Sequence, residues 1–395
     1  MAGCSFFLGR LVATSFSLVS SSLEDARDPK TWKIDALEQQ IKDQEFVQSL
    51  IFKSQHPMAC DAVRFLVRDT RIPHKDGFAS DFQYVARLLQ SAVSTRRTLF
   101  ISRDWRSTYA PRSCQDGWTC LWRPISNCIK ASYRSKQVHE NNATSFESSL
   151  SFGVLPKKQR RSDTSSWFDP IAYGSRAILP APISFPLKHT TALIDVLPHW
   201  ERVYGRFWVR AQMAYYLWRP SEWLQNEMEQ RLQKTQLVAP YYIGMHVRFT
   251  DNIPDLANSF GRNATMTRSL DRFLQVADRI RQEHPTIRTI YLATDHAQMV
   301  EWAQKQYPRW TWISQSQVQR ATTTDRMWFA QGQSTAGAEM ATDLHLLQQA
   351  DYLIGSFQSN VFRLAAQLNT AHHVAKYSVR QRRHFTVDVE WFEDP

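Results

Sequence analysis

Between residues 241 and 377, short apolar runs alternate with stretches of helical periodicity, and this alternation constrains the fold more than any other sequence feature. Strands that alternate with helices are typical of a parallel sheet, because parallel strands need crossover connections. The predicted strands cover residues 241–247, 289–293, 310–313, 352–355 and 373–377, and the predicted helices cover residues 266–281, 296–307, 335–350 and 360–368. This pattern predicts a Rossmann-like domain that binds a nucleotide.

The residues before this domain predict a second unit. At 395 residues, with 43% hydrophobic residues, 14 Trp and 22 Phe, the chain is long enough for two domains with sizeable cores. Helical periodicity occurs in residues 32–51, 81–93, 200–216 and 220–237, and a short strand is expected at residues 97–102. We therefore divide the chain into a leader (1–31), an N-terminal helical and α/β domain (32–238) with a loop-rich insertion at about 129–190, the Rossmann-like domain (239–378) and a tail (379–395).

The first predicted strand of the Rossmann-like domain ends in polar residues, among them His246, Arg248 and Asp251. Ligands of open α/β sheets bind at the carboxyl ends of the strands, and side chains two residues apart point to the same side. The planar fork of an arginine matches phosphate oxygens two at a time, so His246 and Arg248 predict an anion site that would suit a diphosphate. The alternative is that Arg248 pairs with a structural carboxylate such as Asp251, with His246 satisfied in the core.

Two carboxylates further along the chain have both a structural and a functional interpretation. Asp295 follows the second predicted strand, and with Gln298 three residues later it fits a helix capping box. Asp343 shares a helix face with apolar residues, so its carboxylate needs a specific partner. That partner is either the two adjacent N–H donors of a guanine base or the cation of a structural salt bridge.

The segment Gly355-Ser-Phe-Gln-Ser-Asn360 leaves a predicted strand and opens a helix. The first backbone N–H groups of a helix have no intrahelical acceptor, and together with the side chains of Ser359 and Asn360 they can hold a phosphate. A simple N-cap is the alternative interpretation.

Charge and cysteine content restrict the partners and the compartment. The formal charge of +11 is compatible with nucleic acid, with an anionic substrate such as a nucleotide sugar, or with a basic surface, but no nucleic-acid-binding module is recognisable. None of the five cysteines forms a CxxC pair, so disulfides are favoured over a zinc site. With the glycosylation tripeptides at Asn142 and Asn263, this indicates a lumenal protein. Residues 4–22, interrupted by Arg10, predict a secretory signal or a degraded signal anchor rather than a bilayer-spanning helix.

Taken in order, several of these stretches resemble the eukaryotic α-1,6-fucosyltransferases, the core fucosyltransferases of glycosyltransferase family 23. That family has a strand ending His-Val-Arg-Arg-Thr-Asp-Lys, and this chain has His246-Val-Arg-Phe-Thr-Asp-Asn252. Other similar stretches are Tyr291-Leu-Ala-Thr-Asp295, Asp343-Leu-His-Leu-Leu-Gln-Gln-Ala-Asp-Tyr-Leu353, Ser356-Phe-Gln-Ser-Asn-Val-Phe-Arg363 and Trp218-Arg-Pro-Ser-Glu-Trp223. The resemblance covers roughly residues 32 to 378.

The resemblance implies a two-domain, GT-B-like α/β glycosyltransferase in the secretory pathway, in the Golgi lumen. It implies inverting transfer of L-fucose from GDP-fucose to a glycan hydroxyl, with the 6-hydroxyl of the innermost GlcNAc of N-glycans as the favoured acceptor, and with no metal or other cofactor. The partners are then GDP-fucose and an N-glycan or glycoprotein acceptor, not nucleic acid, and the membrane is reached only through the leader.

The resemblance also assigns roles to residues of this chain. His246 and Asp343 face the guanine, Arg248, Ser359 and Asn360 hold the diphosphate, and Asp251 and Asp295 complete the candidate donor-binding set. Cys60 pairs with Cys128, and Cys114 is able to pair with Cys120.

Some positions depart from the family pattern. Phe249 replaces the second arginine, Asn252 replaces the lysine, and Leu256 stands at the position of the glutamate base, so Asp255 is the nearest candidate base. The family's C-terminal SH3 module has no counterpart before the chain stops at Pro395. The alternatives are therefore a fucosyltransferase with another glycan or peptide acceptor, or a catalytically silent relative that binds a GDP-sugar or a glycan.

Overall fold

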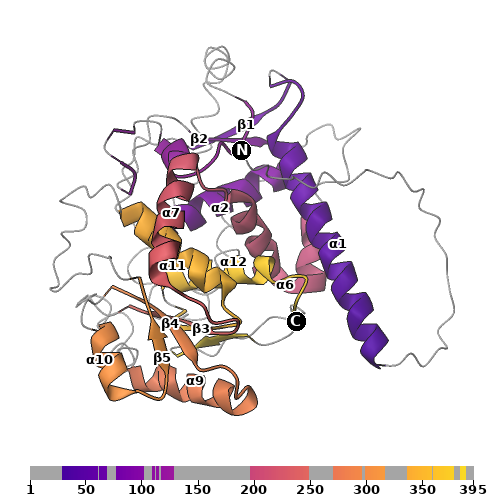
Figure 1. Cartoon of the computed structure of the whole chain (residues 1–395). Helices are drawn as coiled ribbons and strands as arrows, with labels where there is room; N and C mark the ends of the chain where they lie inside the picture. Colours follow the sequence, from indigo (N-terminus) through magenta and orange to yellow (C-terminus); the bar gives the residue numbers. More distant parts are fainter. Residues whose placement is uncertain are drawn as a thin grey trace, which may run out of the picture.

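The computed structural model describes residues 29–60, 62–68, 77–101, 109–111, 113–114, 117–128, 196–248, 270–295, 299–315, 336–357, 359–377 and 383–387 (Figure 1). Within these residues the C-terminal half forms a five-stranded parallel sheet in the order β5-β4-β3-β6-β7. Its strands are β3 (Ile243–Val247), β4 (Thr289–Thr294), β5 (Thr311–Ile313), β6 (Tyr352–Gly355) and β7 (His384–Thr386). The chain order reverses between β3 and β6, and such a switch point is where open α/β sheets bind ligands. The predicted α/β class with a Rossmann-like sheet is confirmed.

Helices cover both faces of this sheet, with α9 (Leu270–Glu283) and α10 (Met299–Gln306) on one face and α11 (Ala336–Gln349) and α12 (Asn360–His372) on the other (Figure 1). Side chains alternate between the two faces along each strand. In β4, Ile290 and Leu292 join the core under α9 and α10, whereas Tyr291 joins the core on the α11 side. Gly244 of β3 allows α11 to pack closely, since a Cβ there would lie 2.9 Å from that of Ala350.

The fifth strand does not lie where the sequence pattern placed it. Residues 373–377 form a turn after α12, and β7 begins at His384, within the segment assigned to the tail. The turn is held because Asp351 accepts hydrogen bonds from Lys376 Nζ at 2.6 Å and from the Tyr377 hydroxyl at 2.9 Å. These polar tertiary contacts outweigh the β propensity of Val374 and Tyr377 in this short segment.

The N-terminal lobe consists of α1 (Pro29–Gln55), β1 (Phe65–Arg68), α2 (Phe78–Ser94), β2 (Thr98–Ile101), a 3₁₀ turn (Gly117–Cys120), α6 (Val196–Leu217) and α7 (Glu222–Thr235). The strands β1 and β2 pair in parallel, and β1 was not predicted because four residues show too little periodicity. The helix α6 consists of two helices that meet at Gly205, where φ is 82°. Among the described residues, no helix is apolar over a length sufficient to cross a bilayer.

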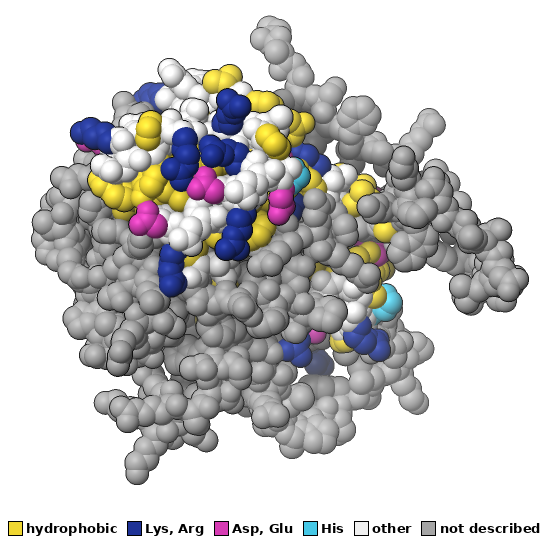
Figure 2. All heavy atoms as spheres, turned by 90° about the horizontal axis from the view of Figure 1, so that it is seen from below, with side chains coloured by type: hydrophobic (Ala, Val, Ile, Leu, Met, Phe, Trp, Pro, Cys, Tyr) yellow, Lys and Arg dark blue, Asp and Glu magenta, His cyan; other side chains and the backbone are white. Residues whose placement is uncertain are grey.

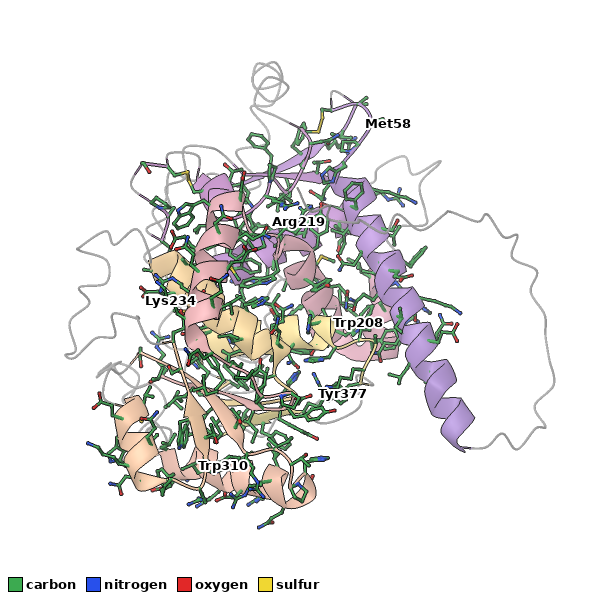
Figure 3. All side chains as sticks on the ribbon, viewed as in Figure 1. Met58, Trp208, Arg219, Lys234, Trp310 and Tyr377 are labelled. Carbon is green, nitrogen blue, oxygen red and sulfur yellow. A yellow bond between two sulfur atoms is a disulfide. The ribbon has the colours of Figure 1, made fainter. Side chains whose placement is uncertain are left out.

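The two lobes share one of the two hydrophobic cores. Buried residues of α2, α6 and α7 form a continuous cluster with those of α11 and α12, and Trp208 lies in this shared core. Trp310 lies in the second core, between the sheet and the α9–α10 layer (Figure 3). Helices α11 and α12 therefore belong to the Rossmann-like sheet and to the N-terminal lobe at once.

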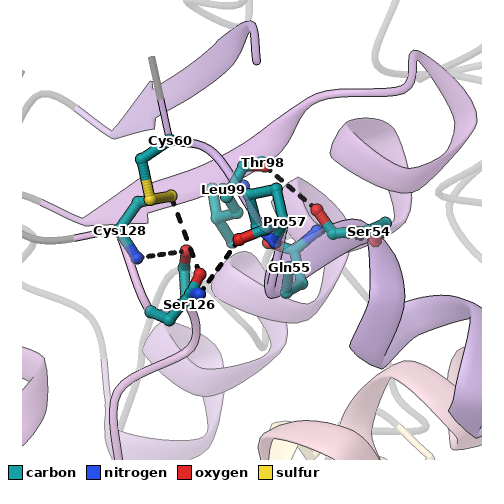
Figure 4. The surroundings of a disulfide bond; sticks show 9 residues. Ser54, Gln55, Pro57, Cys60, Thr98, Leu99, Ser126 and Cys128 are labelled. Atoms are coloured by element: carbon teal, nitrogen blue, oxygen red, sulfur yellow. Dashed lines mark hydrogen bonds between the residues drawn. A yellow bond between two sulfur atoms is a disulfide. The ribbon is translucent and has the colours of Figure 1, made fainter. Parts of the chain in front are cut away.

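Two disulfides, Cys60–Cys128 and Cys114–Cys120, tie the loops of the N-terminal lobe together, with Cα–Cα distances of 5.5 and 5.9 Å. Both pairings agree with the sequence-based expectation. The first joins residues with a sequence separation of 68. By restricting the unfolded chain, a cross-link over a loop of this length stabilises the folded state by about 4 kcal/mol. Beside it, Asn127 donates to the Pro57 carbonyl, and Gln55 accepts from the Leu99 backbone N–H (Figure 4).

Candidate functional site

The carboxyl edge of the sheet brings together polar residues from three strands. Arg248 follows β3, Asp295 follows β4, and Ser359 and Asn360 begin α12 after β6. By strand alternation, His246 points to the same face as Tyr291, because His246 pairs in register with Ala293. That face is the one covered by α11, α12 and the N-terminal lobe, so the candidate site lies between the lobe and the sheet.

His246 is buried, with 7% of its surface exposed, and its Nδ1 has no hydrogen-bond partner among the described residues. Burial lowers the pKa of the imidazole to about 4, although the nearby Asp295 carboxylate raises this pKa and the Arg248 guanidinium lowers it. The imidazole is therefore neutral near pH 7. A neutral ring can donate or accept a hydrogen bond from a ligand at this position.

Ser359 shows the same feature at the neighbouring strand end. It is 3% exposed, it occupies the N-cap position of α12, and its side chain makes no capping hydrogen bond. Its Oγ has no partner within the described part of the chain. A buried polar atom without a partner costs about 1–3 kcal/mol. Two such atoms lie at adjacent strand ends, beside the N–H groups of a helix N-terminus, and they are available to a ligand at this position.

Asn360 is held by two neighbours. Its Oδ1 accepts a hydrogen bond from Arg363 Nη2 at 2.5 Å, and its backbone carbonyl accepts one from Gln83 Nε2 of α2 at 2.9 Å. Gln83 was not singled out in the sequence, because nothing in a helical periodicity shows that a half-buried glutamine contacts a residue 277 positions away.

Asp343 lies on α11, is 9% exposed, and its Oδ1 accepts hydrogen bonds from the Tyr291 hydroxyl and from Gln315 Nε2, both at 2.5 Å. Both of these donors are neutral groups. Tyr291 lies in one of the stretches that resemble the family, whereas Gln315 lies two residues beyond the end of β5 and was missed. A polar residue just after a parallel strand is the signal that could have found it.

Other predicted features lie outside the described residues, namely Asp251, Asp255, Phe249, Leu256, Gln298, the insertion at 129–190 and most of the leader. The helix-cap interpretation of Asp295 stays a prediction for this reason. Among the residues that are described, no three His, Cys, Asp or Glu side chains gather where they could hold a metal ion.

Residues 10–379 match a family model described as alpha-(1,6)-fucosyltransferase N- and catalytic domains. The chain belongs to this family. The resemblance found in the sequence motifs is thereby confirmed over most of the chain, including the N-terminal lobe.

Curated alpha-(1,6)-fucosyltransferases are similar to this chain at low identity. The protein of Drosophila melanogaster is 26% identical over 329 residues, which cover 82% of this chain and 46% of the relative. The protein of Caenorhabditis elegans is 22% identical over 340 residues, which cover 84% of this chain and 54% of the relative. The chain thus spans about half the length of these two family members.

Among solved structures, the NodZ alpha-1,6-fucosyltransferase soaked with GDP-fucose is 16% identical, with a TM-score of 0.40. That comparison covers 78% of this chain and 92% of NodZ.

Proposed function

We propose that this chain is a fucosyltransferase that transfers L-fucose from GDP-fucose to a glycan hydroxyl with inversion at the anomeric carbon. The favoured acceptor is the 6-hydroxyl of the innermost GlcNAc of N-glycans. The observation that carries the proposal is a pair of buried polar atoms, His246 Nδ1 and Ser359 Oγ, that have no partner among the described residues and lie at the switch point of a sheet in a member of this family. The curated relatives bear the name alpha-(1,6)-fucosyltransferase, which supports the favoured acceptor position.

In this proposal, different residues at the sheet edge contact different parts of GDP-fucose. Arg248, Ser359 and Asn360 contact the diphosphate, because a guanidinium fork and the N-terminus of α12 both favour phosphate oxygens. The neutral His246 and the Asp343 carboxylate contact the guanine, whose adjacent N–H groups a carboxylate can accept. Asp251 and Asp295 complete the donor set.

The reaction breaks the bond between fucose C1 and the β-phosphate oxygen, and the acceptor oxygen forms the new bond to C1 from the opposite face. Negative charge builds on the departing GDP, and Arg248 with the α12 N-terminus stabilises it. The acceptor hydroxyl loses its proton to a carboxylate, for which Asp255 is the candidate, a contribution of roughly 10²–10⁴-fold. Groups of the protein, rather than a metal, neutralise the leaving group in this scheme.

The secretory pathway, and the Golgi lumen within it, is the proposed location. Disulfides persist in oxidising compartments, and both disulfides of the N-terminal lobe fit such a compartment.

The test is transfer by the purified chain from isotope-labelled GDP-fucose to a biantennary glycopeptide, followed by mass spectrometry of the product and measurement of GDP release. We expect a fucosylated glycopeptide, loss of the product in Arg248→Ala, and normal activity in Arg279→Ala, an exposed arginine on the far layer α9. Failure of the unchanged chain to form product or to bind GDP would refute the proposal.

A second candidate function is a catalytically silent relative that binds a GDP-sugar or a glycan. The observation that favours it is the pair Phe249 and Leu256, at positions where the family has an arginine and a glutamate. Micromolar binding of GDP in calorimetry without transfer to any glycopeptide would select this candidate.

The face formed by α9 and α10 does not favour binding of nucleic acid. Seen from below, the face formed by α9 and α10 carries Lys and Arg mixed with Asp and Glu (Figure 2). For example, Arg309 pairs with Asp278 at 2.7 Å. A phosphate backbone requires clustered cations of one sign.

A further inference from the structure

The helix α12 links the candidate donor site to the N-terminal lobe. It runs between the sheet and the helices of the lobe (Figure 1). Its first residues, Ser359 and Asn360, follow β6 at the carboxyl edge of the sheet, while its buried side chains, such as Phe362 and Leu364, belong to the core shared with α2 and α6. The far end of α12 is bound by α1, because Gln44 Nε2 donates to the Ala371 carbonyl at 3.0 Å. The helix is thus fixed by the lobe along its length and at both ends.

At the donor end, a side chain of α2 contributes a hydrogen bond to this fixation. Gln83 Nε2 donates to the backbone carbonyl of Asn360 at 2.9 Å, and Gln83 itself is half-buried. This hydrogen bond occupies the backbone carbonyl of the first helical residue and none of its N–H groups. The N–H groups of the first turn of α12 therefore stay available to a ligand.

The side chain of Asn360 is oriented at the same time. Its Oδ1 accepts from Arg363 Nη2, so its amide nitrogen, with two N–H donors, points away from the guanidinium. The main chain and the side chain of Asn360 are therefore each held by a different residue. Donors that bind a diphosphate must be kept within roughly 0.5 Å of their working positions, and such second contacts do this.

We propose that Gln83 is a positioning residue for the donor diphosphate, which it sets by fixing the first turn of α12 relative to the N-terminal lobe. This inference rests on the proposed function, since it assumes that GDP-fucose binds at the carboxyl edge of the sheet. Gln83 acts on the diphosphate half of the donor, because its hydrogen bond to the site runs through Asn360. The guanine half is held by Asp343 and His246, on α11 and β3.

The experiment compares GDP with guanosine, which lacks both phosphates, by calorimetry on the full chain. Gln83→Met keeps the length and approximate volume of the side chain and removes its N–H donors. We expect its Kd for GDP to rise about 3- to 10-fold, as the loss of one hydrogen bond predicts, with the Kd for guanosine changed less than about 2-fold. In transfer assays the KM for GDP-fucose rises by a similar factor.

The matched control is Gln90→Met, on the same helix and also half-buried. Gln90 Nε2 faces Glu201 Oε1 at 3.4 Å, a contact within the N-terminal lobe. This variant should bind GDP and guanosine like the unchanged chain. Gln83→Glu is the second variant, since it keeps a polar side chain but places a carboxylate opposite the Asn360 carbonyl, and it should lose at least as much GDP affinity.

The outcomes separate the inference from the proposed function. Unchanged GDP affinity in folded Gln83→Met and Gln83→Glu, or an equal loss for GDP and guanosine, would overturn the positioning role alone. Absence of GDP binding by the unchanged chain would overturn the proposed function and this inference with it.

Discussion

The two edges of the C-terminal sheet differ in how their central polar side chains are bonded: Asp351 and Asn369 at the amino edge each make several hydrogen bonds, whereas His246 Nδ1 and Ser359 Oγ at the carboxyl edge have no partner among the described residues. The amino edge is not complete either, since Arg383 Nη1 and Gln348 Oε1 also have no partner there among these residues. At the amino edge, Asp351 accepts hydrogen bonds from Lys376, Tyr377 and the backbone N–H of Tyr242. A fully bonded polar network stabilises a fold, while an incomplete one costs free energy that a ligand can recover. We therefore expect substitutions at Asp351 and Asn369 to change mainly stability, and substitutions at the carboxyl edge to change mainly ligand binding.

The largest effect is expected at the amino edge. Asn369 is fully buried, its Nδ2 donates to the carbonyls of Gln348 and Ala350, and its Oδ1 accepts from Arg383 and His384. Asn369→Leu should lower the free energy of unfolding by about 3–5 kcal/mol, because it leaves several buried groups and a guanidinium unpaired. Urea denaturation measures this loss, with Thr370→Val on the same helix as the control. A loss below about 1 kcal/mol would remove the contrast between the edges.

At the carboxyl edge, removing the cation should affect binding and leave stability nearly unchanged. Arg248 is exposed at the end of β3. Arg248→Ala should weaken GDP binding about 10- to 150-fold, the range for a charge-assisted hydrogen bond. Calorimetry and thermal denaturation on the same preparation separate the two effects. A fall in thermal stability without a fall in GDP affinity would show instead that Arg248 has a structural role.

The buried His246 at the carboxyl edge should make folding stability depend on pH. The folded pKa of His246, about 4, lies below the unfolded value of about 6.5, so the unfolded state binds the proton first as pH falls. The stability that His246 contributes is complete above pH 6.5 and is lost as pH falls toward 4. Between pH 6.5 and 5 the unchanged chain should lose about 1–2 kcal/mol more than His246→Gln does. Parallel pH profiles of the two proteins would contradict the buried, neutral imidazole.

The smallest expected effect is a change in folding stability on replacing a serine by alanine. Its sign should differ between two serines that both precede helices. Ser359→Ala removes a buried hydroxyl without a partner, so it should stabilise the ligand-free protein by about 1 kcal/mol and weaken GDP binding about 2- to 10-fold. Ser221→Ala removes an N-cap whose Oγ accepts from the Leu224 N–H at 3.2 Å, so it should destabilise by about 1 kcal/mol. Denaturation of both variants, with GDP calorimetry of the first, tests this. The same sign at both serines would show that Ser359 is an ordinary cap.

Much of the C-terminal sheet could be predicted from the sequence because its signals are local. An apolar strand followed by polar residues, and the helix start after β6, showed where His246, Arg248, Ser359 and Asn360 would lie, and the structure places all four at one sheet edge. The partners of these residues could not be predicted in the same way. Gln83 reaches Asn360, and Gln315 reaches Asp343, across chain separations that no sequence periodicity reports.

The sequence by itself determined the alternation of strands and helices, the family and the type of each polar residue at the strand ends, because propensity and hydrophobic patterning act over a few residues. Only the tertiary structure decided that residues 373–377 turn instead of forming a strand, that α12 is shared by both lobes, and which buried polar atoms stay unpaired. Those outcomes depend on contacts between segments that lie from 25 to 277 residues apart in the chain. Such contacts contribute free energy only when the segments meet.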